Sequence, residues 1–132
     1  MRLWHEKLID KLPKQHLQGQ HRECCAMRGN GWGMNHSTVD YVFENDFEKL
    51  VAYHIKVIGE LLKLNVNINR KWLKYKYRGK KCKPKEKLNF QMIDHILVIN
   101  EKVYSEHDEN YMKECIDNLL EKGVTCRYFK EV

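Results

Sequence analysis

The chain has 132 residues, 42% hydrophobic and 32% charged, which indicates one globular domain over residues 1–132 and excludes a disordered polymer. No apolar run approaches the roughly 20 residues that span a bilayer, and the first residues lack the apolar segment of a secretory signal. The formal net charge of +6 favours a polyanionic partner over a small neutral one.

The first predicted element is a helix over residues 13–28. Pro13 suits the start of a helix, because the N–H that proline lacks has no intrahelical partner there. Gly29-Asn30-Gly31 is expected to end the helix, because glycine and asparagine accept the positive φ that a helix stop often needs. Residues 32–42 are expected to form a loop.

A second helix is predicted from Phe47 to Leu62, where apolar residues recur at intervals of three and four. Asn45 or Asp46 can cap its start. His54 falls on the apolar face of this helix and is expected to be a hydrogen-bonded core histidine. The asparagine-rich residues 65–69 break the pattern.

Two more helices are predicted in the second half of the chain. The apolar run over residues 87–100 favours a helix, although it is also compatible with a buried strand, and His95 within it is expected to lie in the core. A fourth helix begins near Asp108 and ends at Gly123, and residues 124–132 are expected to form a short extended tail. The predicted fold class is therefore all-α, a compact helical domain.

Residues 70–87, named here the basic connector, hold ten Lys and Arg and a single acid, Glu86. The rest of the chain carries more acidic than basic residues, so this segment provides the whole positive excess. Its cations alternate with aromatic residues, a pattern that suits phosphates and stacked bases. A solvated strand whose aromatics pack on the core is the alternative, and the two interpretations are compatible.

Five cysteines form no C-x-x-C pair, and we expect reduced thiols, a cytoplasmic location and no metal. His21 with Cys24 and Cys25 could form part of a metal site or a thiol enzyme, but buried small hydrophobic residues are the simpler interpretation.

The predicted first helix also carries a polar stripe. His16 and Glu23 are seven residues apart and therefore share a helix face, with Arg22 next to the carboxylate. Such a stripe can transfer protons or stabilise a developing cation, although an ordinary solvated face has the same composition.

Gln15-His16-Leu17 followed by Arg22-Glu23, at this distance from the chain start, resembles the phage-type pyrimidine-dimer DNA glycosylase/AP lyase family, the endonuclease V family. Weaker similarity continues through residues 42–68 and reaches Tyr77-Arg78-Gly79. The resemblance implies that the α-amine of Met1 attacks the sugar carbon C1′, displaces the base and forms a Schiff base, after which β-elimination nicks the strand. An α-amine has a pKa of about 7.7–8.0, so a useful fraction is neutral near pH 7.

The resemblance assigns catalytic roles to Met1, Glu23, Arg22 and His16, and no cofactor. Because Arg2 is bulky, we expect Met1 to be retained. Damaged double-stranded DNA is the expected partner of a monomeric, bacterial or phage-type protein that associates with the nucleoid. The residues expected to contact nucleic acid are Arg2, Gln15, Arg28, His36, Arg70, Trp72, Lys74, Tyr75, Lys76, Arg78, Lys80 and Lys81. The lesion stays open between a cyclobutane dimer, an oxidised pyrimidine and an abasic site, and the alternative function is a non-catalytic nucleic-acid-binding protein.

Overall fold

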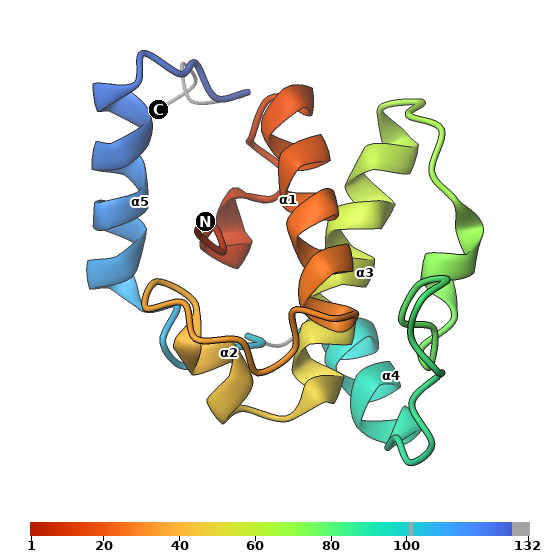
Figure 1. Ribbon diagram of the computed structural model, residues 1–132. Coiled ribbons are helices and arrows are strands. Elements are labelled where there is room, and N and C mark those ends of the chain that lie inside the picture. The colour runs from red at the N-terminus through yellow and green to blue at the C-terminus, as the bar shows by residue number, and fades with distance from the viewer. Residues whose placement is uncertain (101, 128–132) are drawn as a thin grey trace.

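The computed structural model describes residues 1–100 and 102–127, and all regular structure within these ranges is helical (Figure 1). The prediction of an all-α fold is therefore confirmed. Five α-helices and two short 3-10 helices follow one another as η1 (Glu6–Leu8), α1 (Lys14–Arg28), α2 (Asp40–Glu44), α3 (Phe47–Lys63), η2 (Arg70–Leu73), α4 (Phe90–Ile99) and α5 (Glu109–Glu121).

Helix α3 is the centre of the core. Nine of its residues are buried, and it packs against α1, α2, α4 and η2. Burial of apolar surface stabilises this arrangement, at about 25 cal/mol for each Å² removed from water. None of the described helices is both long and apolar enough to cross a membrane.

The N-terminal segment lies between α1 and α5, so the start of the chain is enclosed by helices that are far apart in sequence (Figure 1). The basic connector runs along the opposite side of the molecule, beyond α1 and α3. Leu3, Trp4 and Leu8 of the N-terminal segment are buried in the hydrophobic core. This burial holds the start of the chain against the body of the protein.

The predicted ends of α1, α3 and α5 agree closely with the structure, but the reason given for the end of α1 is wrong. Gly29 has a φ of −93°, and neither Asn30 nor Gly31 has a positive φ. The glycines permit close packing instead: a Cβ on Gly29 would lie 2.9 Å from the Arg78 carbonyl oxygen, and one on Gly31 would lie 2.7 Å from the Ala26 carbonyl oxygen.

Three further expectations need comment. Residues 32–42 are not all loop, because α2 begins at Asp40. His54 is fully buried and hydrogen-bonded, which confirms the core assignment, whereas His95 is exposed on α4, so its core assignment is wrong. Residues 124–127 hold no regular structure, and the rest of the predicted tail lies outside the described residues.

Candidate active site

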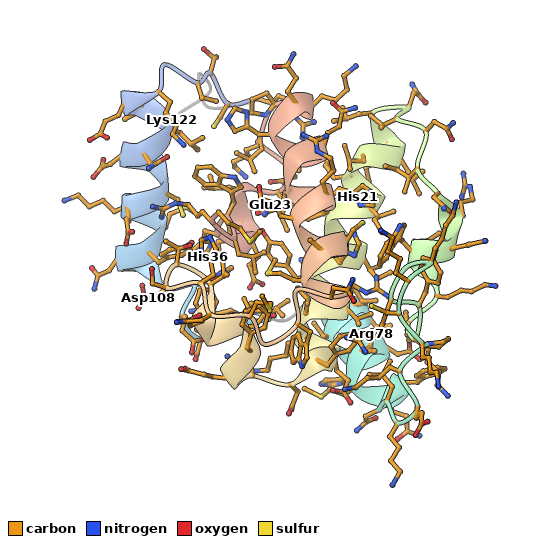
Figure 2. The ribbon with its side chains drawn as sticks, viewed as in Figure 1. His21, Glu23, His36, Arg78, Asp108 and Lys122 are labelled. Atoms are coloured by element: carbon orange, nitrogen blue, oxygen red, sulfur yellow. The ribbon has the colours of Figure 1, made fainter. Side chains whose placement is uncertain are left out.

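A cavity of about 520 Å³ opens where the N-terminal segment meets α1 and α5. Helix α1 lines it with Gln15, His16, Gly19 and Glu23, which recur at helical spacing along one face. The other lining residues are Met1, Arg2, Trp4, Thr38, Asn118 and Lys122. In Figure 2, Glu23 lies on the side of α1 that faces α5, and Lys122 projects from α5.

A buried amide holds the chain start against α1. The Gln20 side chain, 1% exposed, donates from Nε2 to the Arg2 carbonyl (3.0 Å) and accepts at Oε1 from the Trp4 N–H (2.7 Å). The Tyr53 hydroxyl, from α3, donates to the Trp4 carbonyl at 2.5 Å. Thr38 donates to the Met1 carbonyl. These contacts hold the backbone on both sides of Arg2 against α1 and α3.

Glu23 is the carboxylate of this cavity. Burial raises its pKa above the ordinary value, while a backbone hydrogen bond from Arg2, the charge of the terminal amine and the charge of Arg22 lower it. Among the described residues its Oε2 atom is buried without a hydrogen-bond partner. A carboxylate that is half-buried, close to an amine and not fully hydrogen-bonded is suited to proton transfer.

Cations surround the same cavity. Arg2 forms an ion pair with Glu114 of α5 (3.2 Å), and Lys122 lies 6.0 Å from the centre of the Trp4 ring. Burial, and secondarily the charge of Lys122, lowers the pKa of His16. The cavity therefore combines an amine, an acid and positive charge, a set that suits a negatively charged ligand.

The opposite face of α1 forms a different cluster, which packs against α3. His21 Nδ1 lies 2.8 Å from His54 Nε2, and Arg28 Nη1 lies 3.0 Å from His54 Nδ1. Because a guanidinium can only donate, His54 accepts at Nδ1 and, when neutral, donates from Nε2 to His21. Burial, Arg28 and His21 all lower the pKa of His54, which keeps it neutral.

His21, Cys25 and His54 place one potential ligand atom each within 4.8 Å of one another, a spacing that could hold a metal ion. The donor set fits poorly. A metal on His54 Nε2 would move the ring proton to Nδ1, which faces the N–H of Arg28. Burial also raises the pKa of the Cys25 thiol to about 12 and that of Cys24 well above its ordinary value, which disfavours a thiolate nucleophile.

Arg28, expected to contact DNA, is instead fully buried. Its Nη1 atom donates to the Trp72 carbonyl (2.9 Å), and its Nη2 atom lies 2.9–3.2 Å from the carbonyl oxygens of Lys74, Tyr75 and Tyr77. The expectation is wrong for this structure, because a guanidinium surrounded by backbone carbonyls cannot reach a phosphate. Arg28 holds the basic connector on the end of α1.

The other connector residues divide by type. Arg70, Lys74, Lys76, Lys80 and Lys81 are exposed, whereas Trp72 and Tyr75 are half-buried against the protein. Trp72 packs on Tyr77, with ring centres 4.7 Å apart, and on the Arg28 guanidinium. Arg78 donates to the carbonyls of Arg28 and Gly29, at 2.7 and 3.0 Å, so it too stabilises the junction.

The structure thus brings together Met1, Arg2, Gln15, His16 and Glu23 of the predicted site residues. Arg22 is exposed next to Glu23 in the chain. His36 lies on the loop that follows α1, and its Nδ1 atom is 3.1 Å from Thr38 Oγ1. The connector residues lie away from the cavity, on the other side of α1 (Figure 1). Sequence reasoning missed the lining residues Trp4, Gly19, Thr38, Asn118 and Lys122. The spacing of Asn118 and Lys122 placed them on one helix face, but nothing in the sequence placed that face beside Met1.

Comparison with known proteins adds independent evidence. A family model described as pyrimidine dimer DNA glycosylase matches residues 1–74, more than half of the chain. No curated protein and no solved structure matches the chain. The matched region includes α1 with Glu23 and the whole N-terminal segment, and stops before α4 and α5. The family model and the all-helical fold lead to one conclusion: the chain belongs to the pyrimidine dimer DNA glycosylase family.

Proposed function

We propose that this protein is a DNA repair glycosylase with AP lyase activity, acting on damaged pyrimidines through a Schiff base on the α-amine of Met1. One observation carries the proposal: the chain start and the Glu23 carboxylate line a single cavity, in which one carboxylate oxygen has no hydrogen-bond partner among residues 1–100 and 102–127. Membership of the glycosylase family supports DNA as the substrate and pyrimidine dimers as the lesion class.

The amine performs the first step. The neutral amine attacks C1′ of the damaged nucleotide, the bond from C1′ to the base breaks, and the base leaves with the electron pair. The resulting secondary ammonium gives a proton to Glu23. The nitrogen lone pair then opens the bond between C1′ and the ring oxygen, which takes that proton back from Glu23 and becomes a hydroxyl.

Elimination completes the reaction. The protonated imine acidifies the hydrogens on C2′. A proton-accepting group removes one of them, and the bond from C3′ to its phosphate oxygen breaks. Water then hydrolyses the imine and releases the amine. Glu23 suits the proton transfers, because burial raises the pKa of its carboxyl towards the working range of a general acid–base group.

The cations of the cavity hold the strand. Arg2 and Lys122 in the cavity lining, and the exposed Arg22, can bind phosphates that flank the damaged nucleotide. His16 can hydrogen-bond near the reacting sugar. Turning a nucleotide out of the duplex costs a few kcal/mol, which such contacts must offset. The exposed lysines of the basic connector extend the positive surface along the duplex.

Borohydride trapping tests the proposal. Incubation with DNA that contains an abasic site or a pyrimidine dimer, with borohydride present, should give a covalent protein–DNA adduct. An added N-terminal peptide should abolish the adduct, whereas the same peptide at the C-terminus should not. A tagged N-terminus that still traps would overturn the assignment of the α-amine.

Glu23 is tested separately. Glu23→Gln keeps the shape but removes the titrating oxygen, and should slow adduct formation by roughly 10²–10⁴-fold. Glu44→Gln, at an exposed position of α2, makes the same change of charge and serves as the control. Full activity in Glu23→Gln would contradict the assigned role.

The alternative is a nucleic-acid-binding protein without chemistry, which the exposed cations of the connector favour. It predicts salt-sensitive DNA binding and no adduct. A connector lysine such as Lys74 or Lys80 could also be trapped slowly at abasic sites. The N-terminal block separates the two cases, because it should leave trapping on a lysine unchanged.

Further expectations belong to the same proposal. Residues 1–132 are proposed to act as one domain, because α5 lines the same cavity as the matched N-terminal region. A monomer, a metal-free reaction and a cytoplasmic location also stay predictions. Size-exclusion chromatography with light scattering, and trapping in the presence of a chelator, would test the first two.

A further inference from the structure

Two acceptors in the cavity lack hydrogen-bond partners. Glu23 Oε2 and Asn118 Oδ1 are both buried, and within residues 1–100 and 102–127 neither receives a hydrogen bond. Both residues line the same cavity, one from α1 and the other from α5. An unsatisfied buried acceptor costs about 1–3 kcal/mol, so two in one cavity indicate a missing ligand with hydrogen-bond donors.

The proposed reaction creates two such donors. Opening of the sugar ring turns the ring oxygen into a hydroxyl on C4′, and the nitrogen of Met1 becomes a protonated imine with an N–H. Met1 and Glu23 line the same cavity, and the charge of the terminal amine lowers the pKa of that carboxyl. The imine N–H is therefore the donor assigned to Glu23. Once Glu23 has protonated the ring oxygen and accepts from the imine N–H, the new C4′ hydroxyl can turn its hydrogen to the second acceptor.

We propose that Asn118 is a substrate-contacting residue whose Oδ1 atom accepts a hydrogen bond from the C4′ hydroxyl of the opened sugar. The inference rests on the proposed function and extends it to α5, outside the region that the family model matches. Because the hydroxyl exists only after ring opening, this contact stabilises the covalent intermediate more than the intact nucleotide.

The position of Asn118 supports the assignment. Lys122 follows it by one helical turn and lines the same cavity, so a single face of α5 presents an amide and a cation to the substrate. Leu119, next to Asn118, is buried in the core and Cys115 is fully buried one turn earlier. The burial of these neighbours fixes the helix, and with it the direction in which Asn118 projects.

Two substitutions separate the acceptor from the donor of the amide. Asn118→Asp keeps an oxygen acceptor and should trap within about threefold of the wild-type rate, whereas Asn118→Leu removes the hydrogen bond and should trap about tenfold more slowly. Asn110→Leu, at an exposed position of α5, is the control and should not change the rate. If Asn118→Asp traps more slowly than Asn118→Leu, the Asn118 amide donates to a phosphate and the inference is overturned.

Stability gives a second readout that a structural role would not reproduce. Because Asn118 Oδ1 has no partner among the residues that the structure describes, Asn118→Leu should leave Tm unchanged or raise it by a few degrees while activity falls. A lower Tm that accounts for the slower trapping would contradict the inference.

Two substrates complete the test. On abasic DNA the defect of Asn118→Leu should persist, because the opened sugar is present without a base; a defect confined to dimer DNA would show a base contact instead. Binding to DNA with a tetrahydrofuran abasic analogue, whose ring cannot open, should stay within twofold of wild type. If wild-type protein gives no adduct, the proposed function itself fails; a wild-type rate in Asn118→Leu overturns only the role of Asn118.

Discussion

The two sides of helix α1 hold polar groups in opposite conditions. On the side that faces α5, Glu23 lines an open cavity, and one of its buried oxygens has no hydrogen-bond partner in the described part of the chain. On the side that faces α3, the Arg28 guanidinium contacts four backbone carbonyls and His54. The first arrangement leaves hydrogen-bonding capacity for a ligand, and the second uses nearly all of it within the protein.

Both conditions occur in one helix that is rich in basic and polar residues. Arg22 and Arg28 are six residues apart and chemically identical, yet one is exposed beside the cavity and the other is fully buried. A charged residue near a candidate site is therefore evidence of substrate binding only when its donors are not already used. The following substitutions test this contrast.

The largest effect on stability is expected at Arg28. Arg28→Ala leaves four backbone carbonyls without their donor and should lower the free energy of unfolding by about 3–5 kcal/mol, because charge-assisted hydrogen bonds contribute about 1.5–3 kcal/mol each. Urea denaturation measures the loss. Arg22→Ala is the matched control on the same helix: it should change stability by less than about 0.5 kcal/mol while weakening DNA binding. Equal losses in the two variants would contradict the contrast.

The next effect is expected at Gln20, which holds the chain start. Gln20→Leu leaves the Trp4 N–H and the Arg2 carbonyl without their partners, and should cost about 2 kcal/mol of stability. Adduct formation should fall at saturating DNA, because the terminal amine is no longer fixed beside Glu23. Gln18→Leu, on the same helix but outside the cavity lining, is the control. If Gln20→Leu lowers only the affinity for DNA and not the rate of adduct formation at saturating DNA, Gln20 has no positioning role.

Acid should destabilise the buried histidines. Burial lowers the pKa of His107 to about 3 and that of His54 well below its ordinary value. Below about pH 6.5 these histidines bind protons in the unfolded chain but not in the folded protein. The free energy of unfolding should therefore decrease as the pH is lowered from about 6.5 towards 3, by about 1.4 kcal/mol per pH unit for each histidine. Urea denaturation at several pH values should show this slope. His107→Gln should reduce the slope, and an unchanged slope in this variant would contradict the prediction.

The smallest effect on stability is expected in the basic connector. Lys74→Ala combined with Lys80→Ala should change the free energy of unfolding by less than about 0.5 kcal/mol, because both side chains are exposed. If both lysines contact phosphates, the plot of log binding constant against log salt concentration should become less steep by about 0.9 for each lost contact. The double variant Lys7→Ala, Lys63→Ala removes the same charge elsewhere and is the control. If it changes the salt dependence of DNA binding equally, the effect comes from net charge alone.

Much of the helical organisation follows from the sequence. The spacing of apolar residues predicts α3, α4 and α5, Pro13 marks the start of α1, and Asp108 and Gly123 mark the ends of the last helix correctly. These features depend on residues close together in the chain, which a pattern of three and four residues records directly. The pairing of His16 with Glu23 on one face is a local property of the same kind.

Which residues share the cavity depends on contacts between distant parts of the chain, and only the tertiary structure shows these contacts. Arg28 and Arg22 have the same chemistry in the sequence, and only the packing of the connector buries one of them. Asn118 and Lys122 join the cavity because α5 folds back beside the N-terminal segment, across more than a hundred residues of chain. A sequence pattern records which residues share a helix face, but the chain path decides what each face meets.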